Sequence, residues 1–289
     1  MAQYLHLLTN TGIGLPTDLW VPATDRIKPI TSYQYSAGYY RELPNNMVVS
    51  VEGYYKKMNN LIQYREGVSF IGGSSDWQDR VTSGQGWAYG GEFFLEKKEG
   101  KFTGWIGYTL SWSERQFDEL NFGNKFFHRY DQRHDLNIAL TYDLNETWDF
   151  GVVFVYGTGN AITLPTQNYS VAPNMPGMTS GSWWWSPMVS NFDQMNDYRM
   201  PAYHRLDVGA NRKKQKDFGH SITSISFYNV YNRMNPFYVY QGFNNAGFAT
   251  LKQISLFPII PSISWKFQFD FDKMKQNKLK KVLESTITE

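Results

Sequence analysis

Three features of this 289-residue sequence predict an all-β fold, an antiparallel transmembrane β-barrel segment of about ten strands. Apolar residues alternate with small or polar ones at a period of two, which is the pattern of a strand with two different faces. Aromatic residues make up 17% of the chain and charged residues 19%, against about 25% charged residues in soluble proteins. Short polar turns alternate with long connections, as periplasmic turns and extracellular loops do in outer-membrane barrels.

The connections set the bounds of the expected strands. The short turns are Leu43–Asn46, Glu96–Lys101, Asp143–Thr147 and Arg212–Gly219, and the long connections are Asn10–Pro29, Met58–Gly86, Ser113–Gln132, Thr158–Met200 and Asn232–Gly247. They separate strands at about 2–9, 30–42, 47–57, 86–97, 101–112, 133–143, 147–157, 201–211, 219–231 and 250–269. A soluble β-sandwich also alternates, but loops this long are uncommon in compact soluble domains.

The first strand, 2–9, is followed by a long connection, and the next two, 30–42 and 47–57, are joined by the short turn LPNN. Alternation runs through the four strands between residues 86 and 157 and is among the clearest in the last strand. Their apolar faces are rich in Trp, Tyr and Phe towards the strand ends, which matches a lipid-facing band with aromatic girdles. We expect the side chains of this face to point away from the lumen: Trp87, Tyr89, Phe93, Leu136, Ile138, Leu140, Trp148, Phe150, Ile263, Trp265 and Phe267.

The last three strands end the barrel. Strands 201–211 and 219–231 flank the Lys-rich turn RKKQKDFG, and strand 250–269 alternates up to Phe269, which we expect at the periplasmic side. Pro258 and Pro261 remove donors from the hydrogen-bond ladder, so they predict a bulge or bend near the outer rim. We assign residues 1–269 to the barrel and residues 270–289 to a Lys-rich tail, which is helical or solvated.

Composition excludes several classes of protein and site. The net charge of +2 provides no strong basic field, so we expect no nucleic-acid partner. The absence of cysteine excludes disulfides and thiolate chemistry. No run approaches the roughly 20 apolar residues of a membrane-spanning helix. Met1–Leu8 lacks the basic and apolar regions of a signal peptide, although the remaining chain is typical of an exported protein.

Candidate chemistry is sparse. Alternation places His134 and Asp135 on opposite faces of one strand, and the odd spacing of His204 and Asp207 does the same. We therefore expect no catalytic residues, no metal site, no cofactor and no enzymatic activity. Trp183, Trp184 and Trp185 lie in the longest connection and are the candidate ligand contacts, since an aromatic platform stacks on many solutes. The alternative is that these three side chains pack among the loops or against the outer leaflet.

Eight stretches, in chain order, resemble the C-terminal half of the barrel of TonB-dependent outer-membrane receptors. The likeness is to the Bacteroidetes type, which carries a carboxypeptidase-regulatory-like domain at the front. The matching stretches are Gln3–Ile30 (QYLHLLTNTGIGLPTDLWVPATDRIKPI), Ser50–Gly67, Gly86–Phe117, Arg129–Leu140 (RYDQRHDLNIAL), Tyr156–Thr166 (YGTGNAITLPT), Pro201–Gly209 (PAYHRLDVG), Tyr228–Tyr240 (YNVYNRMNPFYVY) and Ile254–Phe269.

The resemblance implies a Gram-negative outer-membrane location and a role in importing a scarce large solute, of the siderophore, cobalamin or glycan class. Such receptors have 22-stranded barrels closed by a plug and are driven by the TonB complex. The chain would supply the last ten strands, so we expect a fragment. Its partners would be outer-membrane lipid, the extracellular solute, the plug with the first barrel half, and the TonB complex in the intact parent. A free-standing small porin or surface adhesin is the alternative, and an outer-membrane enzyme is a more distant one.

Overall fold

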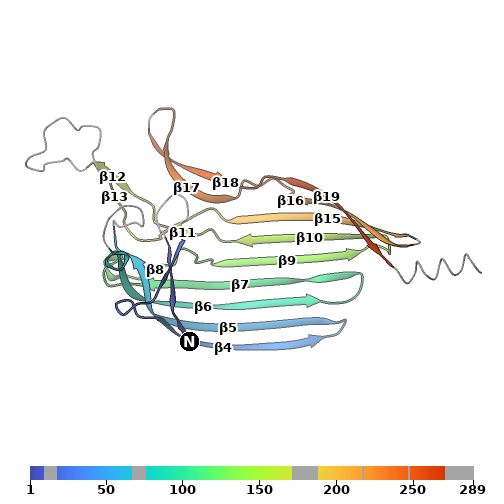
Figure 1. Ribbon diagram of the computed structural model, residues 1–289, viewed down its shortest axis with the longest axis horizontal. Helices are drawn as coiled ribbons and strands as arrows, with labels where there is room; N and C mark the ends of the chain where they lie inside the picture. The colour runs from blue at the N-terminus through green and yellow to red at the C-terminus, as the bar shows by residue number, and fades with distance from the viewer. Residues whose placement is uncertain (10–17, 67–75, 171–187, 217, 247, 271–289) are drawn as a thin grey trace, which may run out of the picture.

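One large antiparallel sheet dominates the computed structural model, which describes residues 1–9, 18–66, 76–170, 188–216, 218–246 and 248–270. The sheet has 11 strands, and β8 pairs with β7 off the main path. The remaining strands follow the order β1-β4-β5-β6-β7-β9-β10-β15-β16-β19 (Figure 1). Because β1 and β19 lie at opposite edges of this path, the sheet is open and does not close into a barrel.

The long strands run side by side and place all their tight turns at one end (Figure 1). They are β4 (Ile30–Leu43), β5 (Met47–Tyr64), β6 (Val81–Lys97), β7 (Phe102–Gln116), β9 (His134–Asp143), β10 (Trp148–Gly157), β15 (Tyr203–Lys216), β16 (Gly219–Tyr228) and β19 (Ile260–Phe269). We call the end with the tight turns the turn end and the opposite end the loop end. The all-β antiparallel prediction is confirmed. The described chain also contains two short 3₁₀ turns, at Trp77–Arg80 and Asn121–Gly123.

The tight turns follow from residues that accept unusual backbone geometry. Asn45 and Asn46 have φ values of 63° and 55° between β4 and β5, a region that Asn tolerates better than most residues. Gly100 has φ 102° between β6 and β7. Between β9 and β10 the side-chain oxygen of Asn145 accepts hydrogen bonds from the backbone N–H of Thr147 and Trp148, both at 2.9 Å. Three of the four expected short turns therefore lie where predicted, and the fourth is shorter because β15 extends to Lys216.

Strand register places every residue of the expected lipid-facing set on one face of the sheet. The pairs Phe93–Tyr108, Tyr108–Leu136 and Leu136–Tyr156 carry this face from β6 to β10. It continues through Val208–Phe227 and Phe227–Pro261 to β19. We call this face the apolar face. Its side chains are not packed between two sheets: Ile263 is 75% exposed and Trp265 67% exposed, which contradicts the sandwich alternative.

The apolar face has an aliphatic middle and aromatic ends. A row of Ile106, Ile138, Phe154 and Leu206 crosses its middle. Tyr55, Tyr89 and Trp112 stack towards the loop end, with centroid distances of 6.4 and 5.4 Å. At the turn end Trp148 stacks on Phe150 and Trp265 on Phe267. This distribution is that of a membrane-spanning wall with two aromatic girdles.

Two strand expectations were wrong. Of the predicted strand 2–9, only β1 (Ala2–Gln3) joins the sheet, and β2 (Leu5–Thr9) pairs with β3 (Asp18–Pro22) across the loop end. The predicted strand 250–269 is two strands, β18 (Ala249–Ser255) and β19. β18 pairs with β17 (Pro236–Phe243) in a separate hairpin, because Phe257 at φ 57° and Pro258 break the chain direction. The break lies at the outer rim, where the prolines predicted a bend.

Small sheets and three buried clusters form the loop end. Besides β2–β3 and β17–β18, these sheets are β11 (Ala161–Ile162) with β14 (Tyr198–Arg199), and β12 (Gln167–Ser170) with β13 (Met188–Asn191). β8 (Phe126–Phe127) extends the main sheet there. The largest side chains buried at this end are Phe117, Leu8, Leu120 and Ile162, so the hydrophobic core of the described chain lies under the loops. Among the described residues, no helix is long and apolar enough to cross a membrane.

Candidate functional site

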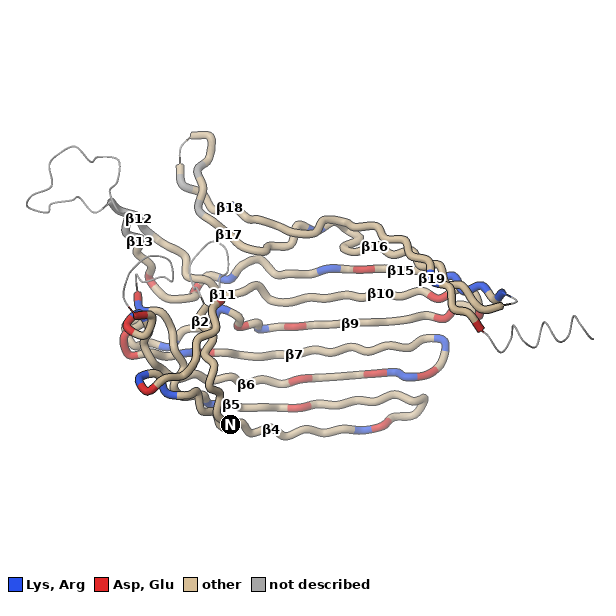
Figure 2. Tube along the Cα trace, in the orientation of Figure 1, with Lys and Arg blue, Asp and Glu red and all other residues tan. Residues whose placement is uncertain are grey.

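The loop end combines charged residues with loops that are held in place by hydrogen bonds and buried side chains. Figure 2 shows that Lys, Arg, Asp and Glu gather at the two ends of the sheet, and that the middle of the strands is mostly free of them. The segments between β7 and β9 and between β10 and β15 meet over the loop end (Figure 1). Because a wall of strands positions these segments, the loop end is the candidate functional site of the described chain.

A buried ion pair joins two of these segments. The Asp131 carboxylate is 1% exposed and accepts a 2.6 Å hydrogen bond from the Ser113 backbone N–H. The Arg199 guanidinium pairs with the same carboxylate and also donates to the Asp131 carbonyl and to the Gly159 carbonyl at 3.3 Å. Arg133 approaches the carboxylate at 3.4 Å. The charge of Asp131 is thus compensated. The carboxylate links three parts of the chain: strand β7, strand β14, and the segment that precedes β9.

Hydrogen bonds of two asparagines also join the segment between β7 and β9 to the segment between β10 and β15. The Asn121 side-chain oxygen accepts a 2.9 Å hydrogen bond from the Met195 backbone N–H. The Asn196 side-chain amide donates to the Phe127 carbonyl at 2.8 Å, and its backbone N–H donates to Thr163 Oγ1 at 3.1 Å. Beneath these contacts lies a buried cluster of Leu61, Phe117, Leu120, Phe126 and Met195. These hydrogen bonds and this cluster preorganise the loop surface, which lowers the entropy lost on binding.

The N-terminal hairpin β2–β3 closes over part of this end. Leu8 and Val21 from the hairpin pack with Ile62 and Val81 of the main sheet. The Gln63 side-chain amide donates to the Thr9 carbonyl at 2.9 Å. The Tyr130 hydroxyl donates to the Asp18 carboxylate at 2.7 Å, and Asp18 is paired with Thr9 in the hairpin. Both bonds therefore anchor the same end of the hairpin, which forms part of the rim.

Two of the depressions at the loop end lie among the loops. One, of about 360 Å³, has a charged lining that includes Arg26, Arg65, Asp118 and Glu119. The other, of about 220 Å³, lies between Glu114 and Lys125 on one side and the segment 194–197 on the other. Both depressions are open to solvent, so these surfaces suit the edge of a large solute better than the burial of a small one.

Phe122 is the most unusual side chain of this surface. It is 86% exposed and its backbone has φ 55° and ψ 30°, which is strained for a bulky residue. Asn121 beside it also has a positive φ, and Asn121 is fixed by its bonds to Met195 and to the Glu66 carboxylate at 3.1 Å. A strained backbone that presents an aromatic ring to solvent is typical of a binding loop.

Burial tunes two titratable groups of this surface. Burial lowers the pKa of His128 to about 2, and the neighbouring Arg115 and Arg129 charges add to the shift, so its imidazole is neutral at physiological pH. Burial, together with the hydrogen bond to Asp18, which an ionised phenol could not donate, raises the pKa of Tyr130 to about 12. Both groups remain uncharged, so neither is suited to acid–base chemistry at neutral pH.

The histidine–aspartate pairs do not form dyads. The His134 ring meets the Tyr108 hydroxyl at 2.8 Å on the apolar face, and Asp135 pairs with the Asn137 amide on the other face. His204 likewise meets the Tyr231 hydroxyl at 2.8 Å, while Asp207 is bonded to Arg205 at 3.0 Å. Within the described ranges there is no group of three His, Asp or Glu side chains that could hold a metal.

The described residues that form the loop surface are not the ligand contacts expected from the sequence. Trp183, Trp184 and Trp185 lie outside the described residues. Asp131, Arg199 and Phe122 were not singled out from the sequence, although Asp131 and Phe122 lie inside the predicted long connection 113–132. The one local signal was the run of turn-forming residues Asn121-Phe122-Gly123-Asn124. The Asp131–Arg199 pair spans 68 residues, and alternation carries no information at that range.

Residues 7–255 match the model of the family described as "TonB dependent receptor-like, beta-barrel". The chain belongs to this family. Among solved structures the receptor barrel is similar to the ferripyoverdine receptor of the outer membrane of Pseudomonas aeruginosa bound to ferripyoverdine, at 12% identity and a TM-score of 0.50. The likeness covers 83% of this chain and 27% of that one, so the chain spans about a quarter of the length of the solved receptor. No curated protein matches the chain.

As a TonB-dependent receptor barrel, the sheet has a lumen side opposite its apolar face. Glu52 lies opposite Glu92 in the register of β5 and β6, and Asp135 lies on the same side. Thr109, Ser111 and Ser113 of β7 share this polar face. An outward apolar face and an inward polar face are the division that a membrane barrel requires.

Proposed function

We propose that this receptor barrel binds a scarce large solute outside the cell and imports it in an energy-dependent way. The solute class is siderophore, cobalamin or glycan. The single observation that carries this proposal is the preorganised loop end, in which Asp131–Arg199 and Asn121–Met195 hold an exposed aromatic loop above the strand wall. The similar ferripyoverdine receptor supports the siderophore class in particular.

We propose further that this chain is the C-terminal part of a Bacteroidetes-type receptor, and the open sheet supports the need for further strands to complete the barrel. β4 beyond its short pairing with β1, and β19 at the other edge, have no strand partner on their outer sides among the described residues. In lipid each unpaired backbone group costs several kcal/mol. We infer that the first half of the barrel supplies the missing partners, and that a plug within the lumen connects the receptor to the TonB complex.

The test is uptake by the intact receptor that contains this chain, in a strain whose own copy is deleted. Labelled ferric siderophores, cobalamin and oligosaccharides are offered one at a time, with and without the TonB complex. The proposal expects uptake of one of these classes that stops when the TonB complex is removed. Passive, size-limited uptake of many small solutes would overturn the proposal in favour of the porin alternative.

The role of the loop end is tested with Phe122→Ala against Phe257→Ala as a matched control, because both residues are exposed aromatics with positive φ. The proposal expects weaker solute binding only in the Phe122 variant, by about tenfold for one lost aromatic contact of 1–2 kcal/mol. Equal binding by the two variants would remove Phe122 from the site.

A further inference from the structure

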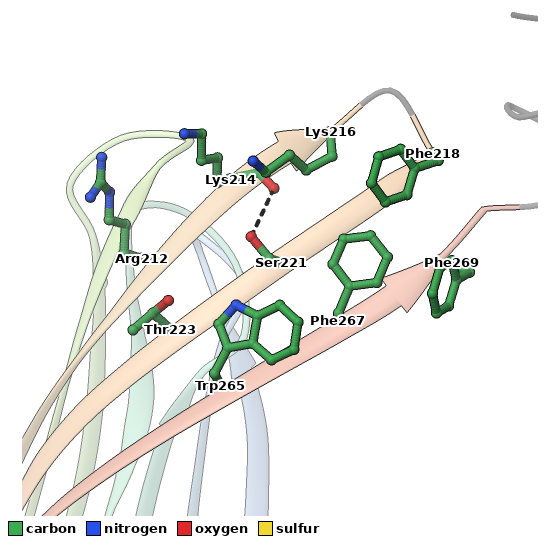
Figure 3. A pocket seen from close by; sticks show the side chains of 9 residues that line it. All are labelled: Arg212, Lys214, Lys216, Phe218, Ser221, Thr223, Trp265, Phe267 and Phe269. Carbon is green, nitrogen blue, oxygen red and sulfur yellow. Dashed lines mark hydrogen bonds between the residues drawn. The ribbon is translucent and has the colours of Figure 1, made fainter.

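A groove of about 490 Å³ crosses the apolar face at the turn end of β15, β16 and β19 (Figure 3). It is far from the loop end and takes no part in the proposed solute site. Its lining combines three cations with aromatic rings and small hydroxyl residues. The lining residues are Arg212, Lys214, Lys216, Phe218, Ser221, Thr223, Trp265, Phe267 and Phe269.

Strand register explains why this surface is hollow. Arg212 pairs with Thr223 and Thr223 with Trp265, and one row further Lys214 pairs with Ser221 and Ser221 with Phe267. Each row therefore carries a long cation on β15, a short hydroxyl residue on β16 and an aromatic ring on β19. Figure 3 shows this order, with Ser221 and Thr223 between the basic side chains and the rings. The floor is small and polar, one wall is cationic and the other wall is aromatic.

The cationic wall is not neutralised within the described chain. Lys213, which points to the opposite face, pairs with Asp149 at 2.9 Å. No described ion pair involves Arg212, Lys214 or Lys216, and no carboxylate among the described residues lines the groove. The turn between β6 and β7 differs, since there Lys98 pairs with Glu96 at 3.6 Å and Asn46 binds Glu99. Three cations that have no described ion-pair partner, on a lipid-facing surface, favour an anionic partner.

We propose that this groove binds an anionic phospholipid of the periplasmic leaflet. The inference rests on the outer-membrane placement of the receptor, in which the turn end faces the periplasm. The lipid phosphate lies against Arg212, Lys214 and Lys216, since guanidinium and ammonium groups are the phosphate binders of proteins. The glycerol meets the hydroxyls of Ser221 and Thr223. The upper part of one acyl chain packs against Trp265 and Phe267, which sit at the depth where aromatic girdles meet the headgroups.

Lipid is the favoured occupant because the groove joins charge to an exposed apolar wall. A free phosphate would satisfy the cations and leave the exposed face of the aromatic wall, where Trp265 is 67% exposed, in contact with water. A zwitterionic phospholipid would bring its own ammonium group next to the three cations. An anionic lipid matches both walls at once.

The experiment compares lipid retention by the full-length receptor. Wild-type protein is purified from nanodiscs that contain equal amounts of phosphatidylglycerol and phosphatidylethanolamine, and retained lipids are counted by native mass spectrometry. A triple variant, Arg212→Gln with Lys214→Gln and Lys216→Gln, removes the cationic wall. The matched control carries Lys97→Gln, Lys98→Gln and Lys101→Gln, which removes the same charge from the same membrane side.

The proposal expects wild type and control to retain phosphatidylglycerol in preference to phosphatidylethanolamine, and the triple variant to lose that preference by about tenfold or more. Equal retention of the two lipids by wild type would overturn it. An equal loss in the control would also overturn it, because the preference would then reflect total charge. Displacement of the lipid by soluble glycerol phosphate would overturn the choice of a lipid over a free anion.

Folding and solute binding are measured on the same samples. A heat-resistant barrel in both variants shows that the transmembrane sheet has formed. A second variant, Trp265→Leu, tests the aromatic wall of the groove without a change of charge. Reduced lipid retention with unchanged solute binding supports the groove alone. Preferential lipid retention by a receptor that imports no solute would contradict the proposed function and leave the lipid site standing.

Discussion

Arg199 of β14 forms an ion pair with Asp131, a side chain that is fully buried and lies 68 residues earlier in the chain. The pair closes a gap between two long connections that leave the sheet at different strands. The guanidinium of Arg199 also lies over the Phe127 ring, with 5.1 Å between its Cζ atom and the ring centroid. The loop end is therefore a packed layer whose parts depend on one another.

Removing Arg199 should loosen this layer without unfolding the strand wall. In Arg199→Ala the Asp131 charge would stay buried with only Arg133 near it, at a cost of about 3 kcal/mol. We expect rapid proteolysis between residues 117 and 200 and an unchanged heat-resistant barrel. The control is Arg65→Ala, whose partner Glu119 is about half exposed, so that change should cost about 1 kcal/mol or less. Equal protease resistance of both variants would contradict the proposed role of the pair.

The two faces of β9 should respond oppositely to a charge. Ile138 lies in the middle of the apolar face between Ile106 and Phe154, and its neighbour Asn137 points to the lumen side. We expect Ile138→Lys to destabilise the barrel by about 2–4 kcal/mol, which is the cost of Lys at the bilayer midplane. Asn137→Lys should cost much less. Urea unfolding of the receptor in liposomes measures both variants, and similar losses would show that the faces are misassigned.

Acid should weaken the loop end through His128. The pKa of His128 is about 2 in the folded state and 6.5 in the unfolded state. Between these pH values the unfolded segment binds a proton and the folded segment does not. The stabilisation is present above pH 6.5 and is lost as the pH falls from there towards 2, by at most about 1.4 kcal/mol per pH unit. The protection factors of the amide hydrogens in residues 117–133, which correct exchange for its intrinsic pH dependence, should therefore fall at pH 5 in wild type and change less in His128→Gln.

His220 provides the control for this pH effect because it lies at the turn end of the sheet, on β16. His220→Gln should keep the full acid response of the loop end. If His128→Gln and wild type lose protection equally between pH 7 and pH 5, the response arises from other groups.

The three tryptophans of the longest connection remain candidate ligand contacts. Replacing Trp183, Trp184 and Trp185 by Ala in the intact receptor should weaken solute binding without removing the barrel from the membrane, because these side chains belong to a loop. Surface labelling checks membrane insertion, and direct binding of the imported solute gives the affinity. Unchanged affinity would favour the alternative, in which the three rings pack among the loops.

The chain by itself should not form a stable barrel. Exported with a signal peptide, it would expose the outer edges of β4 and β19 to lipid, at several kcal/mol per unpaired group. We expect no heat-modifiable, protease-resistant species in the outer membrane and no energy-dependent uptake. The same chain within the intact receptor is the control. A stable barrel without uptake would favour the small porin, and uptake by the chain alone would contradict the prediction.

Local sequence determined the wall. The alternation of Leu136, Ile138 and Leu140 with Asn137 and Ala139 specifies which face meets lipid, because a strand turns each successive side chain to the opposite side. Turn chemistry is equally local. Asn145 caps the β9–β10 turn through bonds to residues two and three positions away. For that reason the strands between residues 86 and 157 and their turns could be predicted.

Tertiary structure decided which segments pair at the loop end, which charges are buried there and where the groove forms. Leu5–Thr9 alternates well enough for a wall strand, yet it pairs with Asp18–Pro22 because Leu8 gains burial against Ile62 and Val81 at the loop end. Asp131 and Arg199 read as ordinary loop charges until folding buries the carboxylate beside its partner. The groove at Arg212 requires β15, β16 and β19 in one register, although β19 begins 48 residues after Arg212. Burial and pairing at such separations depend on which segments meet in space, whereas the period of a strand is contained in its own residues.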